Sequence, residues 1–445
     1  MRSILILGAG RSAASLIRYL IERSIEQDWR ITVADRNAVH AGALVAGGSD
    51  VASAISLDAT DKDARSAEIA KHDLVISMLP AFMHMDVVKD CIRLRKHVLT
   101  PSYVPDAMWP LDAEAKAAGL VLLNELGLDP GIDHMSAMRI IDRIKANGGT
   151  FEVFESYCGG LVAPESDDNA WGYKFSWNPR NVILAGQGGS AKYIDQGITK
   201  YIPYHKLFQR TVQVSVPGFG AFDGYANRDS LKYRSHYGLD GIPTLKRGTL
   251  RKAGFSIAWN TFVQLGCTDD SFIMELGADA TWRDYINAFL PPDAGRDTRS
   301  NLAYYLDLNP DGEVMRKLDE LRLFSEERIG TSGLSPAGSL QHLLEQRWKL
   351  KPNDKDLVVM WHRFVYGLGG AKHELHASLT SIGQDQTYTA MAKTVGLPVA
   401  IAAKLVLNGK VMQRGVMMPL AAEIYDPVLD ELEQLGIAFS EREVL

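Results

Sequence analysis

The chain has 445 residues, more than one hydrophobic core ordinarily organises, so two or three domains are expected. Its 46% hydrophobic and 23% charged residues are typical of a soluble globular protein, and no apolar run approaches the roughly 20 residues of a membrane helix. A net charge of −6 argues against general nucleic-acid binding. Cys91, Cys158 and Cys267 lack metal or redox spacing, and the N-terminus lacks a signal-peptide pattern. We therefore expect a cytoplasmic protein with reduced thiols and without a metal site or a membrane partner.

The N-terminal residues carry a dinucleotide-binding pattern. An apolar strand over residues 3–7 runs into the turn Gly8-Ala-Gly-Arg-Ser-Ala13, and a helical pattern follows. In this G-x-G-x-x-A turn the first glycine permits the turn, the second lets the backbone approach a pyrophosphate, and the alanine keeps the helix close to the strand. The motif alone is weak, because an ordinary strand-to-helix turn can match it. The next strand ends in the acidic Asp35, which favours a dinucleotide site.

The alternation of strands and helices continues beyond the first turn. Apolar strands are expected at 73–80, 97–100 and 119–123, with helices at 83–95 and 111–118 between them. Near-continuous apolar strands separated by helices predict an α/β fold, a Rossmann doubly wound parallel sheet. The loops after residues 79, 100 and 123 then lie on the same rim of that sheet.

The third of those loops, Asn124–His134, is rich in ionisable groups. It holds two Asp, one Glu and one His on a segment shaped by Pro and Gly. Ligands bind at the carboxyl ends of strands in such sheets, so the loop is a candidate site. The alternative is a turn and helix cap, with Asp129 before Pro130 and Asp133 opening a helix.

The pattern changes after about residue 150. Segments 151–158 and 209–216 alternate apolar and polar residues, which predicts a second sheet. Residues 270–395 are mostly helical in pattern, ending in a helix at 385–395, and a last apolar helix is expected at 398–407. We predict a Rossmann domain from 1–130 plus about 390–445. An α+β substrate-binding and dimerisation domain with its own sheet is predicted over approximately 131–270 with part of 370–390, and a helical domain over 271–370.

Positive charge is concentrated between Arg228 and Lys252. Seven Lys or Arg and two Asp give this window a net charge of +5 in a chain of −6. A solvated basic face is one interpretation. A pocket for a multiply anionic small molecule is the other.

The chain resembles the saccharopine dehydrogenase/saccharopine reductase family, in its glutamate-forming branch. Motifs along nearly the whole length carry the resemblance: Gly8–Ala13, Ser77-Met-Leu-Pro80, Thr100-Pro-Ser-Tyr103, Asn124–His134, Ser156-Tyr-Cys-Gly-Gly160, Gly172-Tyr-Lys-Phe-Ser-Trp177, Tyr225-Ala-Asn-Arg-Asp-Ser230, Arg247-Gly-Thr-Leu-Arg251 and Lys393-Thr-Val-Gly-Leu-Pro398. It implies lysine metabolism through the reversible conversion of saccharopine, NAD(P)+ and water into glutamate, 2-aminoadipate 6-semialdehyde and NAD(P)H. It also implies a homodimer.

The resemblance implies roles for particular residues. Its substrate contacts fall on Ser102, Tyr103, Asp129, Arg228, Thr249, Leu250 and Arg251. Its cofactor contacts fall on Gly8, Gly10, Arg11, Ser12, Ala13, Asp35, Arg36, Asp58, Ala59, Met78, Ser102, Leu128, Asp129, Pro130 and Asn178. We expect Arg228 and Arg251 to bind substrate carboxylates, with Lys174 and Lys252 as secondary candidates. Asp129 is our hypothesis for the general base and Tyr103 for a second catalytic residue, while Glu125, Asp133 and His134 are expected to be scaffold.

The strand-end acid bears on the choice of cofactor. A carboxylate at Asp35 accepts from the ribose 2′-OH of NAD and repels the 2′-phosphate of NADP. Two unit charges ~4 Å apart at an effective dielectric of ~20 interact by roughly 4 kcal/mol. Arg36 could offset this by binding the phosphate. The sequence therefore predicts NAD in preference to NADP.

Two other functions remain open at this point. A carboxynorspermidine or carboxyspermidine synthase performs a related reductive condensation, but its cationic substrate fits poorly with the basic 228–252 window. An NAD(P)-sensing protein without enzymatic activity could share the fold. The loops at 100–103, 124–134 and 225–251 argue against it.

Overall fold

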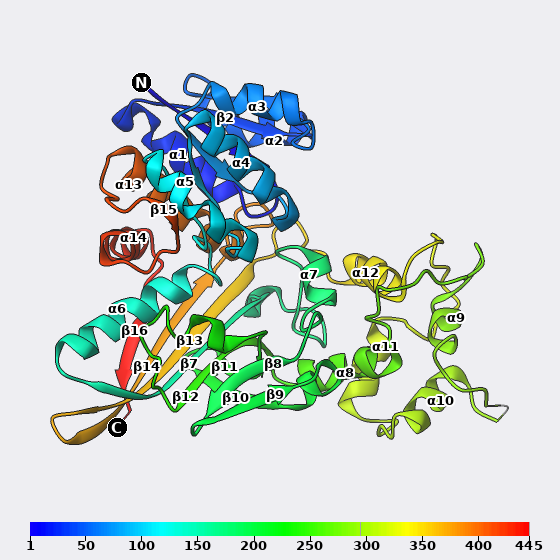
Figure 1. Cartoon of the computed structure of the whole chain (residues 1–445). Helices are drawn as coiled ribbons and strands as arrows, with labels where there is room; N and C mark the ends of the chain where they lie inside the picture. Colours follow the sequence, from blue (N-terminus) through cyan, green and yellow to red (C-terminus); the bar gives the residue numbers. More distant parts are fainter. Residues whose placement is uncertain (294, 445) are drawn as a thin grey trace. The chain divides into compact units, whose positions relative to one another are not determined.

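The computed structural model describes residues 1–293 and 295–444 and divides into two compact units. The first unit comprises residues 1–150 and those from 366 onward, and the second comprises 151–365. Within the first unit a seven-stranded parallel sheet has the order β15-β6-β5-β4-β1-β2-β3 (Figure 1). Its strands are β1 (Arg2–Leu7), β2 (Trp29–Asp35), β3 (Ala52–Ser56), β4 (Leu74–Ser77), β5 (His97–Leu99), β6 (Val121–Leu123) and β15 (Gly415–Met417).

The central strand shows why this sheet forms. Ile4, Leu5, Ile6 and Leu7 of β1 are all fully buried, as expected of a parallel strand covered on both faces. The helices of the unit are α1 (Ala14–Gln27), α2 (Ala38–Val45), α3 (Lys62–Ala70), α4 (His84–Leu94), α5 (Asp112–Ala117), α6 (Ile132–Ala146), α13 (Ala390–Leu407) and α14 (Ala422–Gln434). The chain leaves β1 toward β2 on one side and returns at β4 on the other, so a topological switch point lies between β1 and β4. The predicted doubly wound Rossmann sheet is confirmed.

Helix α13 joins the C-terminal segment to this fold. A Cβ atom at Gly396 would lie 2.9 Å from the Leu16 nitrogen, so α13 and α1 approach closely there. Among the described residues α13 is the one helix long and apolar enough to cross a membrane, and 83% of its 18 residues are buried in the structure. Its apolar surface is therefore used in packing. The predicted division into helices 385–395 and 398–407 is wrong, because α13 is continuous with Pro398 inside it.

The second unit contains a mixed sheet with the order β10-β11-β12-β7-β13 and a β8–β9 hairpin paired to β12. Its strands are β7 (Thr150–Val162), β8 (Ala191–Asp195), β9 (Ile198–Ile202), β10 (Thr211–Val216), β11 (Gly220–Ala226), β12 (Thr244–Lys252) and β13 (Asp356–Leu368). Its helices are α7 (Pro179–Ile183), α8 (Phe255–Leu265), α9 (Trp282–Asn287), α10 (Thr298–Tyr305), α11 (Glu313–Glu320) and α12 (Pro336–Arg347). Buried Trp171, Trp259 and Trp348 lie in one hydrophobic cluster with residues of α8 and α12. The predicted second sheet and helices are thus present.

One predicted helical stretch is wrong. Residues 356–382 form β13 and, in the first unit, β14 (Ala371–Ile382), which pairs with β16 (Ser440–Glu443). Residues 356–362 are buried without interruption, so β13 lacks the alternation of a half-exposed strand there. A continuous apolar run does not distinguish a buried strand from a buried helix. The predicted three-domain boundaries stay a prediction.

Candidate functional site

The turn between β1 and α1 has the geometry of a dinucleotide-binding turn. Gly8 has φ +98°, and a Cβ there would lie 3.0 Å from the Met78 carbonyl oxygen, so only glycine fits. A Cβ at Gly10 would meet nothing within 4 Å, which leaves room for a ligand against the backbone. The first turn of α1 has no side-chain cap, so its N–H groups and positive dipole end can receive an anion. These residues fit the pyrophosphate of a dinucleotide.

Three charged residues lie at the same rim: Asp35 ends β2, Arg36 follows it, and Asp58 comes after β3. Asp35 Oδ2 accepts from the Ala9 N–H and its Oδ1 from the Asn37 N–H, both at 2.8 Å. The carboxylate therefore holds the Gly8–Ala13 turn against β2. The hydroxyl and the N–H of Thr60 lower the pKa of Asp58, and the Arg36 charge adds a smaller effect.

Three of the four ionisable residues in Asn124–His134 are buried structural groups. Glu125, Asp133 and His134 are at most 2% exposed. His134 Nε2 lies 2.8 Å from Glu125 Oε2, while Glu125 Oε1 accepts from the Val104 N–H at 3.0 Å. Asp133 Oδ1 accepts from the Gly131 N–H at 2.6 Å, closing a bend in which a Cβ at Gly131 would lie 2.0 Å from the Gly127 oxygen. These bonds fix the loop shape.

Asp129 is the fourth ionisable residue, and it is only half-buried. The Tyr103 hydroxyl donates to Asp129 Oδ1 at 3.2 Å, and the Asp129–Pro130 peptide is cis. The Glu125 N–H donates to the main-chain carbonyl oxygen of Ser102 at 3.0 Å, which joins the 100–104 loop to the Asn124–His134 loop. The structure thus brings Ser102, Tyr103 and Asp129 together at the carboxyl ends of β5 and β6, beside buried Leu128 and Pro130.

His84 is a residue of this rim that the sequence did not reveal. It opens α4, is 2% exposed, and bridges two hydroxyls: Nδ1 lies 2.8 Å from Ser77 Oγ and Nε2 lies 2.7 Å from Ser102 Oγ. Burial lowers its pKa to about 4. A single histidine at a helix start carries no motif, and the neighbourhood of the three residues follows only from the order of β4 and β5 in the sheet.

Arg251 is the notable cation of the second unit. It is 2% exposed, and its guanidinium carbon lies 5.2 Å from the ring centre of Tyr173, 5.6 Å from that of Phe255 and 6.0 Å from that of Tyr225. Among the residues that the structure describes, its one side-chain hydrogen bond is from NH1 to the Leu250 carbonyl oxygen at 3.0 Å, and its buried Nε has no partner. Within residues 1–293 and 295–444, no carboxylate lies within ion-pair distance of it. A buried cation in this state is stabilised by an anionic ligand.

The other lysine candidates already have carboxylate partners. Lys174 Nζ lies 2.7 Å from Asp168 Oδ1 and 2.6 Å from Asp354 Oδ2, and Lys252 pairs with Asp167. The Lys174 contact, followed by that of Lys351, lowers the pKa of Asp168 to about 2. These lysines therefore fix the chain rather than offer a free charge.

The remaining predicted contacts of this unit differ in geometry. Half-buried Thr249 lies on the same face of β12 as Arg251, whereas the Leu250 side chain points to the opposite face, inside a hydrophobic cluster with Tyr157 and Phe222. Only the main chain of Leu250 can therefore contact a ligand of Arg251. Arg228 is exposed after β11, and exposed Asn178 caps α7 through the Arg180 N–H at 3.0 Å.

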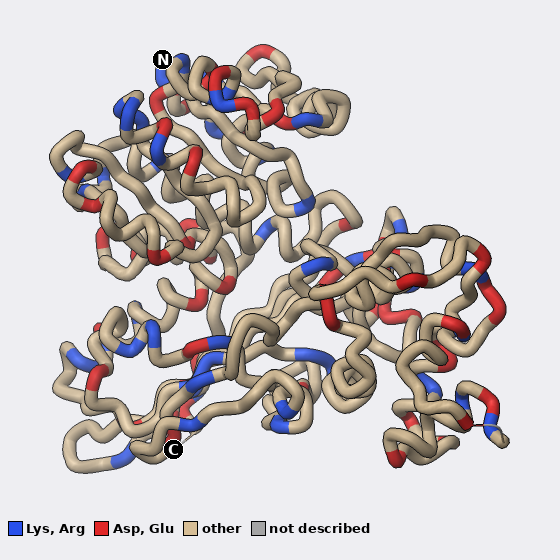
Figure 2. The backbone as a smooth tube through the Cα atoms, turned by 45° about the vertical axis from the view of Figure 1, so that its right-hand side comes forward, with Lys and Arg blue, Asp and Glu red and all other residues tan. Residues whose placement is uncertain are grey.

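The basic window is not a solvated face throughout. Charges of both signs are interspersed along the chain (Figure 2), but Lys246, Arg247 and Arg251 are 8%, 7% and 2% exposed. Lys246 lies 5.1 Å from the Tyr193 ring centre, and Arg247 lies 4.4 Å from that of Tyr233. Three of its cations are thus buried and lie against aromatic rings.

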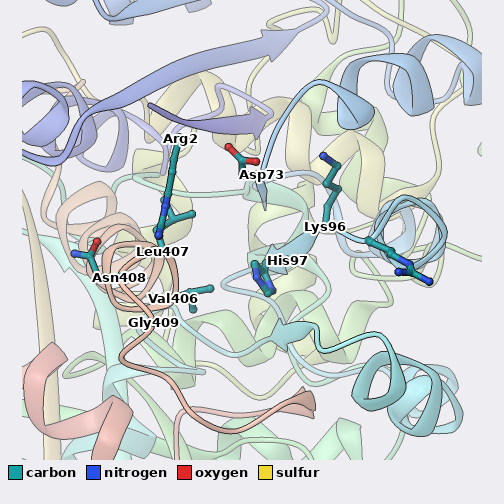
Figure 3. A pocket seen from close by; sticks show the side chains of 9 residues that line it. Arg2, Asp73, Lys96, His97, Val406, Leu407, Asn408 and Gly409 are labelled. Carbon is teal, nitrogen blue, oxygen red and sulfur yellow. The ribbon is translucent and has the colours of Figure 1, made fainter.

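A cavity of about 460 Å³ lies at the amino ends of the strands of the parallel sheet (Figure 3). Arg2, Asp73 and His97 line it at the amino ends of β1, β4 and β5, opposite the dinucleotide turn, and Asn408 lines it just beyond α13. Helices α4 and α13 end here, so its cations offset the negative partial charge of two helix C-termini. This cavity is separate from the candidate site.

Comparison with known proteins places this geometry in one family. Residues 4–123 match the model of the saccharopine dehydrogenase NADP binding domain, and residues 127–437 match that of the saccharopine dehydrogenase C-terminal domain. The saccharopine dehydrogenase [NADP(+), L-glutamate-forming] of Pyricularia oryzae is 36% identical over 100% of this chain and 99% of its own.

Two solved structures extend the comparison. The apo saccharopine dehydrogenase (L-Glu forming) of Saccharomyces cerevisiae has a TM-score of 0.90 at 34% identity and covers all of both chains. The homospermidine synthase of Legionella pneumophila, solved with NAD, has a TM-score of 0.55 at 9% identity over 99% of this chain and 91% of its own. This second likeness shows the fold alone.

Proposed function

Because the chain belongs to the saccharopine dehydrogenase family, an oxidoreductase family acting on CH–NH groups, we propose that it is an L-glutamate-forming saccharopine dehydrogenase using NADP. Arg251 is the observation that carries the proposal. Saccharopine has three carboxylates, and this buried guanidinium has no carboxylate of its own among the described residues. A polyamine-type substrate would add a second positive charge beside it, which disfavours the carboxynorspermidine or carboxyspermidine alternative.

The chemistry assigns different tasks to the chain and to the cofactor. The Gly8–Ala13 turn would hold a nicotinamide dinucleotide, which would supply hydride transfer at the substrate carbon beside the secondary amine. Arg251 binds a substrate carboxylate and Arg228 a second, with Thr249 and Ser102 as hydrogen-bond partners. Asp129 takes the proton of the water that hydrolyses the imine, and the Tyr103 hydroxyl, 3.2 Å away, orients that carboxylate.

Assay of the purified enzyme tests the proposal. With NADP+, absorbance at 340 nm rises only when saccharopine is added. A rise with a carboxylated polyamine and none with saccharopine would establish the alternative. We also propose a homodimer in the cytoplasm, and sedimentation should give twice the 49.0 kDa chain mass.

The NAD preference expected from Asp35 is not supported, because the matching family model is an NADP binding domain and the fungal relative is named for NADP+. The structure offers a reason. Both carboxylate oxygens of Asp35 accept hydrogen bonds from main-chain N–H groups, and these bonds spread the negative charge that would repel a phosphate. Arg36, exposed beside it, is our proposed partner of the 2′-phosphate.

Replacement of Arg36 separates the two cofactors. R36Q should lower kcat/KM with NADP by about 10- to 100-fold, the loss of a charge-assisted contact, and leave the value with NAD within about twofold. Exposed Arg95, near the amino ends of the strands and so on the opposite rim of the sheet, supplies the control R95Q. An equal loss with both cofactors would exclude Arg36 as the phosphate contact.

A further inference from the structure

His84 connects two hydroxyl groups in the first unit, and no charged group of the described residues pairs with it. Its Nδ1 lies 2.8 Å from Ser77 Oγ and its Nε2 lies 2.7 Å from Ser102 Oγ. Thr100 Oγ1 is farther from Nε2, at 3.4 Å. Burial alone lowers its pKa. The imidazole is therefore neutral at the pH of ordinary assays, so one ring nitrogen donates and the other accepts.

The surroundings of Ser77 decide which nitrogen carries the proton. Ser77 is 1% exposed, and within the described residues its hydroxyl has the His84 ring as its one hydrogen-bond partner. A buried hydroxyl proton without an acceptor is costly, so the Ser77 O–H donates to Nδ1. The proton of the ring then lies on Nε2, which donates to Ser102 Oγ.

This arrangement constrains Ser102. Its oxygen accepts from His84, so its own proton is left to donate outward, toward a ligand at the rim. The chain of bonds ends at buried Ser77, without an exit to solvent, so it orients a hydroxyl rather than transporting protons. Half-buried Ser102 is open enough to reach such a ligand.

We infer that His84 is a positioning residue, which holds the Ser102 hydroxyl as a hydrogen-bond donor to an oxygen of the bound cofactor or substrate. The inference rests on the proposed function, because Ser102 is a proposed contact of both. It predicts that His84 acts only through Ser102. It also predicts that a side chain able to donate from the Nε2 position replaces it in part.

A double-mutant cycle tests the coupling. H84L should lower kcat/KM about 10- to 100-fold, the effect of losing one orienting hydrogen bond, whereas H84Q, whose amide can donate to Ser102, should recover most of it. In the S102A background H84L should cost less than about twofold. An equal cost in both backgrounds, or H84Q as impaired as H84L, would overturn the inference.

The tautomer provides a readout independent of activity. In protein labelled with ¹⁵N-histidine and assigned with H84Q, the His84 signals should show Nε2 protonated and Nδ1 unprotonated. The Nδ1–H tautomer would overturn the inference. If instead the wild type does not oxidise saccharopine while the Nε2–H tautomer is present, the proposed function fails and the hydrogen-bond geometry stands.

Discussion

At the scale of single residues, Asp129 differs from its neighbours in exposure. It is half-buried beside Tyr103, whereas Glu125 and His134 form a buried pair. D129N should therefore lower kcat/KM by roughly 10²- to 10⁴-fold, the usual contribution of a general base, without lowering the melting temperature. E125Q should instead lower the melting temperature without a comparable loss of kcat/KM, since disturbing a buried pair costs stability. Near wild-type turnover of D129N would contradict the assignment.

Arg251 combines a cost to stability with a benefit to binding. Because its buried guanidinium lacks a carboxylate among the described residues, R251M should leave the melting temperature unchanged or raise it. It should also raise the KM for saccharopine by about 10-fold or more through the lost carboxylate contact. K174M is the matched control: it leaves Asp354 without its lysine partner and Asp168 with Lys351 alone, and it should lower stability. An unchanged KM in R251M would contradict the substrate role.

Burial of His84 also predicts a pH dependence of stability. Its pKa is about 4 in the fold and about 6.5 in the unfolded chain, so the unfolded state binds the proton first as pH falls. The contribution of neutral His84 to the free energy of unfolding is fully present above pH 6.5 and is lost toward pH 4, by up to about 3 kcal/mol. In urea titrations across this pH range, the free energy of unfolding should fall less steeply with decreasing pH for H84Q than for wild type. Parallel declines would contradict the shift.

At the scale of elements, the close approach of α13 and α1 is directly testable. G396A places a Cβ 2.9 Å from the Leu16 nitrogen and should destabilise the protein by about 1–3 kcal/mol through overpacking. In α2, a Cβ at Gly42 meets nothing within 4 Å, so G42A should be neutral or stabilising. Equal melting temperatures of the two variants would contradict the packing.

The same elements show how far the sequence could lead. The Gly8–Ala13 turn and the strands around it were predictable, because local periodicity and turn chemistry determine them. β13 was not, since a strand buried on both faces loses the alternation that identifies it. His84 was not either, because its bonds to Ser77 and Ser102 depend on which strands are neighbours in the sheet. For Asp35, the main-chain N–H groups that its carboxylate accepts could be counted only in three dimensions.

At the scale of the whole molecule, the two units carry complementary chemistry. The first holds a turn fitted to a dinucleotide together with Ser102, Tyr103 and Asp129, and the second holds buried Arg251, which has no carboxylate partner in the described part of the chain. Together with membership of the saccharopine dehydrogenase family, they support oxidation of an amino acid that carries several carboxylates.

Product analysis tests this account most directly. Purified enzyme given saccharopine and NADP+ should form L-glutamate and NADPH in equal amounts, because the C–N bond breaks on the side that leaves the amine on glutamate. Formation of L-lysine and 2-oxoglutarate, or of NADPH without glutamate, would contradict the central claim.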